Sequence, residues 1–318
     1  MNETLYVAYG LALRSSFALP GMAPADAQGL IPLALELASQ EQLASVWSGA
    51  DGRISWRGRL GDGSDLAIDS GSARDLLFSN GERASFHLDA HKRRLLCVPR
   101  RAGLDWQRTL VTKVLSAISV MCGYEALHAS AVESPWGAIA IAAPSGMGKT
   151  TLALELMRRG WPLLSDDVVA MTNTRDGVLA FPGTPHLNVA HRLPDGIEPE
   201  QIGTTLSILG GERWIAAEAI AHTASPLNAV CLLERASGLA LDVELMPRNP
   251  LPLAPYMLGL PEDLERERRR FELYADLTAS VPLLHVSCDL SDHPADVADL
   301  IEQALAGSVA EPALGASR

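Results

Sequence analysis

The sequence predicts a mixed α/β protein in which a small, mostly-β N-terminal domain precedes a P-loop nucleotide-binding domain. Three observations support this fold class. Short β-like runs separated by turn residues fill the first hundred positions, and strands alternate with helices after them. A glycine-rich loop at 143–150 lies between an apolar strand and a helix. We expect the domains to span residues 1–103 and 104–306, followed by a flexible tail at 307–318.

The N-terminal domain is predicted from four β-like runs with turn signals between them, at residues 5–11, 53–60, 84–88 and 94–98. The stretch 28–48 is the exception, because its leucines, Leu33, Leu35, Leu37 and Leu43, indicate a helix. Residues 104–122 are also predicted to be helical, since apolar side chains recur there every three or four positions. We expect this second helix to lead into the nucleotide domain.

After the glycine-rich loop we expect one strand over 162–171, a return strand over 178–181 and a loop-rich middle up to about residue 211. The remaining predicted elements are a strand at 229–233, a charged helix from about residue 261, a strand at 283–287 and a helix at 295–305.

Composition and charge argue against two kinds of partner. The 318 residues are 47% hydrophobic and carry a net charge of −12, with a pI near 5.1. Because nucleic acids are bound by basic surfaces, we expect no nucleic-acid partner. No apolar run reaches the ~18 to 20 residues of a membrane span, and we find no secretion signal. We therefore expect no membrane partner and a cytoplasmic location.

The four cysteines are predicted to be buried free thiols: Cys97, Cys122, Cys231 and Cys288. They lie far apart without a CxxC pair, and each is in or beside an apolar run. Zinc ligation or disulfide formation is the alternative.

The glycine-rich loop predicts a phosphate-binding site for ATP. Its glycines let backbone N–H groups turn toward phosphates, and the start of the following helix adds its dipole. Lys149 would supply a positive charge and the Thr150 hydroxyl a Mg²⁺ ligand. Ala143 stands where the usual motif has glycine, which is tolerable if its φ stays negative. An ordinary glycine turn is the alternative. The expected nucleotide-binding residues are Ser145, Gly146, Met147, Gly148, Lys149, Thr150 and Thr151.

Two adjacent carboxylates, Asp166 and Asp167, follow Lys149 by 17 and 18 residues. One can bind Mg²⁺ while the other faces an incoming hydroxyl, a division that suits phosphoryl transfer. A solvated turn is the alternative, but apolar neighbours on both sides favour a buried strand edge. His128 precedes Lys149 by 21 residues and, taken alone, is more typical of a structural histidine.

The spacing of His128, the phosphate loop and the Asp-Asp pair resembles the catalytic domain of the HPr kinase/phosphorylase family, over about residues 127–171. The resemblance implies a nucleotide fold similar to phosphoenolpyruvate carboxykinase and an enzyme that phosphorylates a serine hydroxyl on a protein. It implies that Asp167 is the acid/base aspartate, His128 an active-site histidine and Thr150 the Mg²⁺-binding hydroxyl. We assign Asp166 as a further Mg²⁺ ligand. A homo-oligomer is also suggested, because HPr kinases assemble as hexamers.

The sequence departs from this family after the aspartates. HPr kinases carry a glycine- and arginine-rich segment with a metal-binding glutamate there, whereas residues 181–188 read Phe-Pro-Gly-Thr-Pro-His-Leu-Asn and no glutamate follows until Glu198. The second metal ligand of the family therefore cannot be assigned. This Pro-Gly-x-Pro segment, with Tyr9-Gly10-Leu11 and Leu19-Pro20, is more similar to HPr-kinase-related enzymes of ribosomal peptide clusters. Lasso-peptide kinases, which phosphorylate a serine near the end of a precursor peptide, are an example.

Two basic features have open interpretations. Arg213 begins a β-like run and could reach a phosphate of the nucleotide, or it could be a surface arginine whose stem covers Trp214. The charged run 265–270 could grip an acidic peptide or a transferring phosphate, but a solvated helix face is the more typical role of such a pattern.

The leading functional hypothesis is an ATP-dependent serine kinase that acts on a peptide or small protein, with Asp167 as the base and the N-terminal domain as a docking module. A nucleotide-gated binding module with little catalysis is one alternative, and the Asp pair counts against it. A bifunctional kinase/phosphorylase is another, which the absent glycine-arginine segment disfavours.

Overall fold

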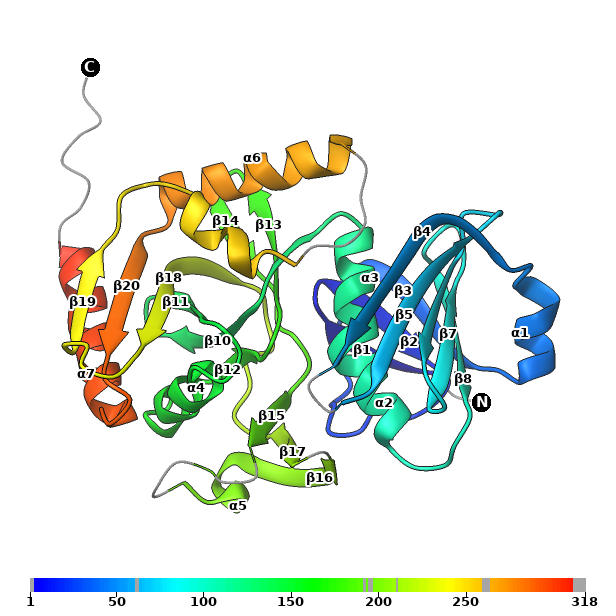
Figure 1. The fold of residues 1–318 in the computed structure, drawn as a ribbon, viewed down its shortest axis with the longest axis horizontal. Helices are drawn as coiled ribbons and strands as arrows, with labels where there is room; N and C mark the ends of the chain where they lie inside the picture. The colour runs from blue at the N-terminus through cyan, green and yellow to red at the C-terminus, as the bar shows by residue number, and fades with distance from the viewer. Residues whose placement is uncertain are drawn as a thin grey trace.

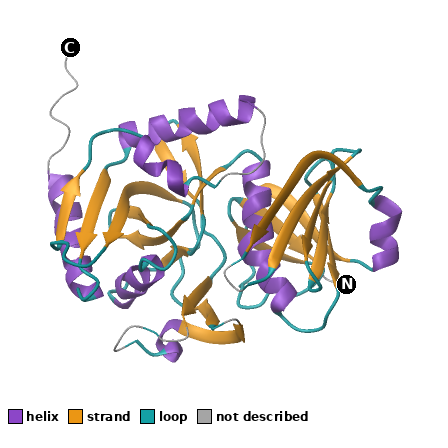
Figure 2. Ribbon diagram, viewed as in Figure 1, coloured by secondary structure: helices purple, strands orange, loops and turns teal. Residues whose placement is uncertain are grey.

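The computed structural model describes residues 3–60, 63–190, 193, 197–209, 211–258 and 264–310. Within these residues the chain is a mixed α/β fold built on three β-sheets (Figures 1 and 2). An eight-stranded sheet comprises the N-terminal strands, and a nine-stranded sheet and a three-stranded sheet comprise the later ones. The predicted fold class, mixed α/β, is thereby confirmed at this coarse level.

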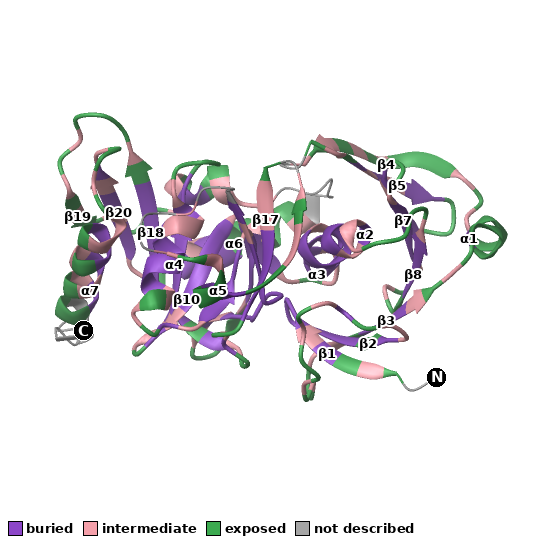
Figure 3. Cartoon of the chain, turned by 90° about the horizontal axis from the view of Figure 1, so that it is seen from below, coloured by how far each residue is buried: buried purple, intermediate pink, exposed green. Residues whose placement is uncertain are grey.

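The eight-stranded sheet curls around one helical segment, which Figure 3 shows nearly end-on. Its order is β1-β2-β3-β8-β7-β6-β5-β4, and its neighbours are antiparallel except for the parallel pairs β2–β3 and β3–β8. The strands are β1 (Thr4–Ala8), β2 (Leu11–Ser15), β3 (Ile31–Leu37), β4 (Ala50–Arg59), β5 (Asp65–Gly71), β6 (Leu76–Asn80), β7 (Ala84–Leu88) and β8 (Arg94–Pro99).

The helix predicted over 28–48 is wrong for most of its length. Strand β3 occupies its first half, and only the short helix α1 (Gln40–Val46) follows. Leu33 and Leu35 are buried while Pro32, Ala34 and Glu36 are exposed or partly exposed, which is the period of a strand rather than of a helix. Ser39 then starts α1 through a capping box with Gln42.

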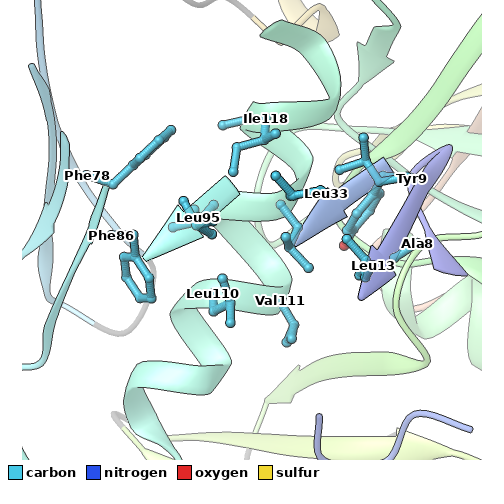
Figure 4. Packing of buried hydrophobic residues seen from close by; sticks show 14 of the residues in the cluster. Ala8, Tyr9, Leu13, Leu33, Phe78, Phe86, Leu95, Leu110, Val111 and Ile118 are labelled. Carbon is cyan, nitrogen blue, oxygen red and sulfur yellow. The ribbon is translucent and has the colours of Figure 1, made fainter. Parts of the chain in front are cut away.

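The helical segment inside the curled sheet runs through α2 (Asp105–Thr109), the π-helical turn η1 (Leu110–Val114) and α3 (Leu115–Met121). The predicted helix over 104–122 is confirmed. Figure 4 shows Leu110, Val111 and Ile118 packed among side chains of the sheet. Because this helix shares the N-terminal hydrophobic cluster, a domain boundary at residue 103 stays a proposal.

Replacing Phe86 by alanine is expected to lower the free energy of unfolding by about 3–5 kcal/mol, since its fully buried ring contributes to the core between sheet and helix. The matched control is Phe271→Ala, whose ring is 59% exposed and should cost no more than about 0.5 kcal/mol. Urea unfolding of both variants measures the difference. Equal losses would contradict the assignment of Phe86 to the core.

The nine-stranded sheet has helices on both faces. Helices α4 (Lys149–Arg158) and α7 (Pro294–Ala310) pack against one face, and α6 (Leu264–Ser280) packs against the other (Figure 1). The strands are β9 (Glu125–Leu127), β10 (Ala129–Ser134), β11 (Gly137–Ala142), β12 (Leu163–Ser165), β13 (Val169–Thr174), β14 (Gly177–Ala180), β18 (Ser225–Arg235), β19 (Asp242–Leu245) and β20 (Leu283–Cys288), and a 3₁₀ helix, η2 (Leu251–Tyr256), precedes α6.

The single strand predicted over 162–171 is wrong, because the chain breaks at the two aspartates. Strand β12 pairs with β10, whereas β13 pairs with β9 and β14, on the far side of β11 and β18. Asp167 lies in this break with φ of +70°, a left-handed conformation that no regular strand contains. The break places Asp166 and Asp167 between the end of β12 and the start of β13, where the chain crosses from one part of the sheet to another.

The middle region predicted to be loop-rich contains the three-stranded sheet. Its order is β15-β17-β16, with all pairs antiparallel, and it consists of β15 (His186–Ala190), β16 (Gly203–Leu209) and β17 (Glu212–Ala217), with the short helix α5 (Pro199–Ile202) before β16. At the C-terminus, α7 extends to Ala310, so residues 307–310 are helical. The rest of the predicted tail, 311–318, lies outside the described residues.

Two segments far apart in the sequence join the N-terminal sheet to the rest of the protein. The Tyr9 N–H donates to the Pro182 carbonyl at 2.7 Å, and His186 Nε2 donates to the Pro20 carbonyl at 2.7 Å. Gly183 has no room for a side chain, because a Cβ atom there would lie 2.0 Å from a neighbouring serine oxygen. The short motifs noted above, Tyr-Gly-Leu with Leu-Pro and Pro-Gly-x-Pro, therefore contact each other.

His186 gives this junction a predictable pH response. Burial lowers the pKa of His186 from 6.5 to about 4, and its ring stacks on Trp214 with centroids 4.6 Å apart. Between these pH values the histidine is protonated in the unfolded chain but neutral in the folded chain. The free energy of unfolding therefore falls as the pH falls from 6.5 to 4, by about 3 kcal/mol in total. Denaturant unfolding across this range should show the loss. The His186→Phe variant, which keeps an aromatic ring, should show a flatter profile, and an unchanged slope would contradict a buried neutral histidine.

The charged run 265–270 is not simply a solvated helix face, because two of its arginines point toward the protein interior. Arg266 and Arg270 of α6 face inward and reach Glu125 Oε1 and Oε2 at 2.9 and 3.4 Å. Arg268 pairs with Glu272 on the exposed side of the helix at 2.8 Å. Inward-facing arginines thus fix α6 to β9.

All four cysteines are free, and three of them are buried while Cys122 is partly exposed, so the free-thiol prediction is confirmed. In the part of the chain that the structure describes, no helix is long and apolar enough to cross a membrane.

Candidate active site

A pocket of about 490 Å³ lies between the glycine-rich loop, the break after β12, strand β15 and the helix of the N-terminal sheet. Its lining combines lysines, aspartates and hydroxyl groups with a few apolar side chains. The residues are Leu60, Arg108, Thr109, Thr112, Lys113, His128, Ser145, Gly146, Gly148, Lys149, Thr150, Thr151, Leu154, Asp166, Asp167, Asn188, Val189, Leu193, Gly211 and Glu212.

The glycine-rich loop connects β11 to α4, as its sequence predicts. Gly146 and Gly148 have φ of +80° and +96°, values that favour glycine over any residue with a side chain. The φ angle of Ala143 is not positive, so alanine fits its position. Helix α4 begins at Lys149 and presents its N-terminus at the pocket, where a helix dipole favours an anion.

Asp166 is held in place from three elements. The hydroxyls of Ser130 and Thr150 donate to its Oδ1 at 2.6 and 3.1 Å, and the backbone N–H of Asn188 donates to its Oδ2 at 3.2 Å. Burial raises the pKa of Asp166, the charge of Asp167 raises it further, and these hydrogen bonds oppose the rise. A carboxylate and a hydroxyl that meet in this way are hard oxygen ligands of the kind Mg²⁺ takes.

Asp167 faces the cationic side of the pocket. Its carboxylate forms an ion pair with Lys113 and lies 3.3 Å from His128 Nδ1. Burial alone would raise the pKa of Asp167, but the charges of Lys113 and Lys149 and the hydrogen bond from Lys113 hold that pKa below its usual value. Asp167 is therefore ionised at neutral pH. The two adjacent aspartates occupy different environments, which is how paired carboxylates acquire separate roles.

Lys149 and His128 are linked by a chain of hydrogen bonds. Lys149 Nζ donates to the Ala143 carbonyl at 2.9 Å and lies 3.3 Å from His128 Nε2. His128 Nδ1 lies 2.8 Å from the Asp167 carbonyl oxygen, so the geometry assigns its proton to Nδ1. Burial lowers the pKa of Lys149, and the two aspartates oppose this shift.

The structure gathers most of the residues that the sequence singles out. Ser145, Gly146, Gly148, Thr150 and Thr151 line the pocket together with the four predicted catalytic residues, Lys149, His128, Asp166 and Asp167. Met147 and Arg213 do not line it. Arg213 lies on β17, in register with Val189 and Ile208 of its two neighbours.

Sequence reasoning missed Lys113, Arg108 and Asn188. Arg108 is buried and donates to Asn188 Oδ1 at 2.7 Å and Glu212 Oε2 at 2.8 Å. Burial lowers the pKa of Lys113, but the carboxylates of Asp167, Asp166 and Glu212 reverse the shift, so its net pKa is raised. One sequence signal was available: the chain has 26 basic residues but only three lysines, at 92, 113 and 149, and two of them lie in this pocket.

Part of the chain is similar in sequence to a protein of known family. No family model matches the chain. A 63-residue segment is 38% identical to the HPr kinase/phosphorylase of Chloroherpeton thalassium, a match that covers 20% of this chain and 18% of that relative's length.

The solved structure of the Hpr(Ser) kinase/phosphatase from Coxiella burnetii aligns with 58% of this chain and 98% of that chain, at 16% identity and a TM-score of 0.34. This sequence match is to the same family that the motifs around the phosphate loop and the aspartates resemble. In this respect the chain is HPr-kinase-like.

Proposed function

We propose that the protein is an ATP-dependent kinase that phosphorylates a serine hydroxyl on a peptide or small protein. The observation that carries this proposal is the meeting of Lys149, Thr150, Asp166 and Asp167 in one pocket, where the two aspartates have different partners. One aspartate is paired with the loop hydroxyl and the other with cations. A site that only binds nucleotide needs no second carboxylate of this kind.

Nucleotide binding falls to the loop and the start of α4. The backbone of 145–151 and the Lys149 ammonium would hold the β- and γ-phosphates, because the helix N-terminus and the loop amides favour anions. In the nucleotide complex Lys149 would exchange its bond to the Ala143 carbonyl for phosphate oxygens. Arg213 has no assigned part in this arrangement, and neither does the side chain of Met147.

Thr150 and Asp166 fit a magnesium ion. Their oxygens lie 3.1 Å apart, so both can reach one cation, and Mg²⁺ in kinase sites takes one or two protein ligands with phosphate and water oxygens. Ser130 and the Asn188 N–H would orient the Asp166 carboxylate. When bound, the ion would neutralise charge that develops on the phosphates.

Asp167 is the proposed base. Its carboxylate is ionised and faces the pocket, so it can accept the serine proton as the serine oxygen bonds to the γ-phosphorus. The bond to the β-phosphate oxygen breaks, and its electron pair leaves with ADP. Since such transition states are loose, positioning and charge neutralisation supply most of the rate.

The proposal is tested with ATP, Mg²⁺ and a peptide library whose only hydroxyl residue is a central serine, read by mass spectrometry. We expect a subset of peptides to gain one phosphoryl group, with transfer lost when EDTA removes Mg²⁺. Tight binding of ATP without any transfer to peptide or water would instead favour the nucleotide-gated binding module.

The proposed phosphate acceptor is a class of molecule, namely a peptide or small protein that carries a serine. The two short motifs that resemble peptide-cluster enzymes contact each other at the junction with the N-terminal sheet. This contact accounts for both motifs without any role in binding a peptide. The reverse reaction, phosphorolysis of a phosphoserine, would use the same pocket. Release of pyrophosphate from a phosphopeptide in the presence of inorganic phosphate tests for it.

A further inference from the structure

Lys113 is a charged residue of the pocket that neither the motifs nor the proposed steps account for. It lies on the helix inside the N-terminal sheet, forms an ion pair with Asp167 and lines the pocket. We propose that Lys113 is a catalytic cation that contacts the transferring phosphoryl group. This inference rests on the proposed function and deepens it, since the active site would then be completed by a helix packed in the N-terminal sheet.

The helix holds Lys113 rigidly. On its core side Leu110, Val111 and Val114 are fully buried against the N-terminal sheet. One turn before the lysine, Arg108 bridges to the three-stranded sheet through Asn188 and Glu212. A cation carried on a helix that is fixed from both sides starts from a preorganised backbone, and preorganisation is the condition for strong electrostatic stabilisation of a transition state.

The local backbone also sets this residue apart. Lys113 lies within the π-helical turn Leu110–Val114, a conformation that is rare and often found at functional sites. Around it Val111 and Val114 remain in the core while the lysine reaches the pocket. Its side chain is 31% exposed, so the ammonium is accessible to a ligand.

The charge of the reaction calls for such a cation. As the acceptor oxygen bonds to the γ-phosphorus and the bond to ADP breaks, negative charge spreads over the three remaining phosphoryl oxygens. Lys149 lies at the end of the phosphate loop and Lys113 on the helix inside the N-terminal sheet. The charges of both lysines lower the pKa of Asp167. A phosphoryl group beside Asp167 would therefore meet two ammonium groups from different parts of the fold. Lysine suits this position because its charge is compact and its donors can rotate.

A purely structural lysine would explain the ion pair equally well, so the test must separate ground state from transition state. The probes are Mg²⁺–ADP and Mg²⁺–ADP–aluminium fluoride, a mimic of the transferring phosphoryl group, and neither requires a known acceptor. For Lys113→Met we expect the Kd of Mg²⁺–ADP to stay within about twofold, while affinity for the aluminium fluoride complex falls by about 10²–10³-fold. Lys113→Arg should recover part of the loss.

Lys92→Met is the matched control, because Lys92 donates to the Met121 carbonyl at the far end of the same helix and does not line the pocket. It should bind both complexes like the wild type. Equal weakening of both complexes by Lys113→Met, or no weakening, would overturn the inference. If the wild type itself bound the aluminium fluoride complex no more tightly than Mg²⁺–ADP, the proposed kinase function would fail instead.

Discussion

Replacing Asp167 by asparagine is expected to reduce phosphoryl transfer by about 10²–10⁴-fold, the contribution of a positioned general base, while nucleotide affinity stays within about twofold. Asparagine is a suitable substitute because it tolerates the positive φ that Asp167 adopts. It removes the charge and the proton acceptor but keeps the shape. The loss should therefore appear in kcat and not in the Kd of ATP.

Single-turnover transfer from labelled ATP measures this effect, with binding followed separately by calorimetry. Asp176→Asn is the matched control, since Asp176 lies in the exposed turn between β13 and β14 and loses the same charge away from the pocket. Transfer at the wild-type rate by Asp167→Asn would show that Asp167 is not the base.

Removing the Asp166 carboxylate is expected to weaken Mg²⁺-dependent activity strongly. Asp166→Asn should lower kcat/KM by about 10²-fold or more and raise the Mg²⁺ concentration needed for half-maximal rate, because a metal ion supplies several kcal/mol of charge stabilisation. The reason is geometric: the Asp166 carboxylate meets the hydroxyl of Thr150, a residue at the start of α4 that lines the pocket. Initial rates over a Mg²⁺ titration measure both quantities.

Thr150 provides a paired control for this prediction. Thr150→Val, which is nearly isosteric but lacks the hydroxyl, should show the same Mg²⁺ defect, whereas Thr150→Ser should resemble the wild type. Circular dichroism checks that the Asp166 variant is folded, since the carboxylate is buried and accepts three hydrogen bonds. An unchanged Mg²⁺ requirement in a folded Asp166→Asn would contradict its assignment as a metal ligand.

Local patterns in the sequence predicted the elements whose signal is local. The 104–122 helix and the strands β7 and β8 follow from spacing and turns alone. The prediction for 28–48 failed because its leucines fit the spacing of a helix as well as that of a strand. Only the burial of Leu33 and Leu35 in the sheet selects a strand. The curl of the sheet around the helix depends on long-range pairing, which no local pattern encodes.

The candidate site was predictable where its residues cluster in sequence. The loop, His128 and the aspartates lie within about 40 residues, and one fold motif relates them. Lys113 comes from a helix that the sequence identifies only by its apolar face, so its polar side carried no signal beyond the scarcity of lysine. The break in the strand at Asp167 was missed because its apolar flanks resemble one continuous strand.

A crystal structure with Mg²⁺ and ADP–aluminium fluoride is the most direct test of the central claim, that the pocket transfers the γ-phosphoryl group of ATP. It should place the phosphates along the 145–151 loop, Mg²⁺ on Thr150 and Asp166, and the aluminium fluoride between Lys149 and Asp167, with Asp167 facing the axial oxygen. Phosphates bound away from this loop, or Asp167 turned away from the axial position, would contradict the proposed transfer.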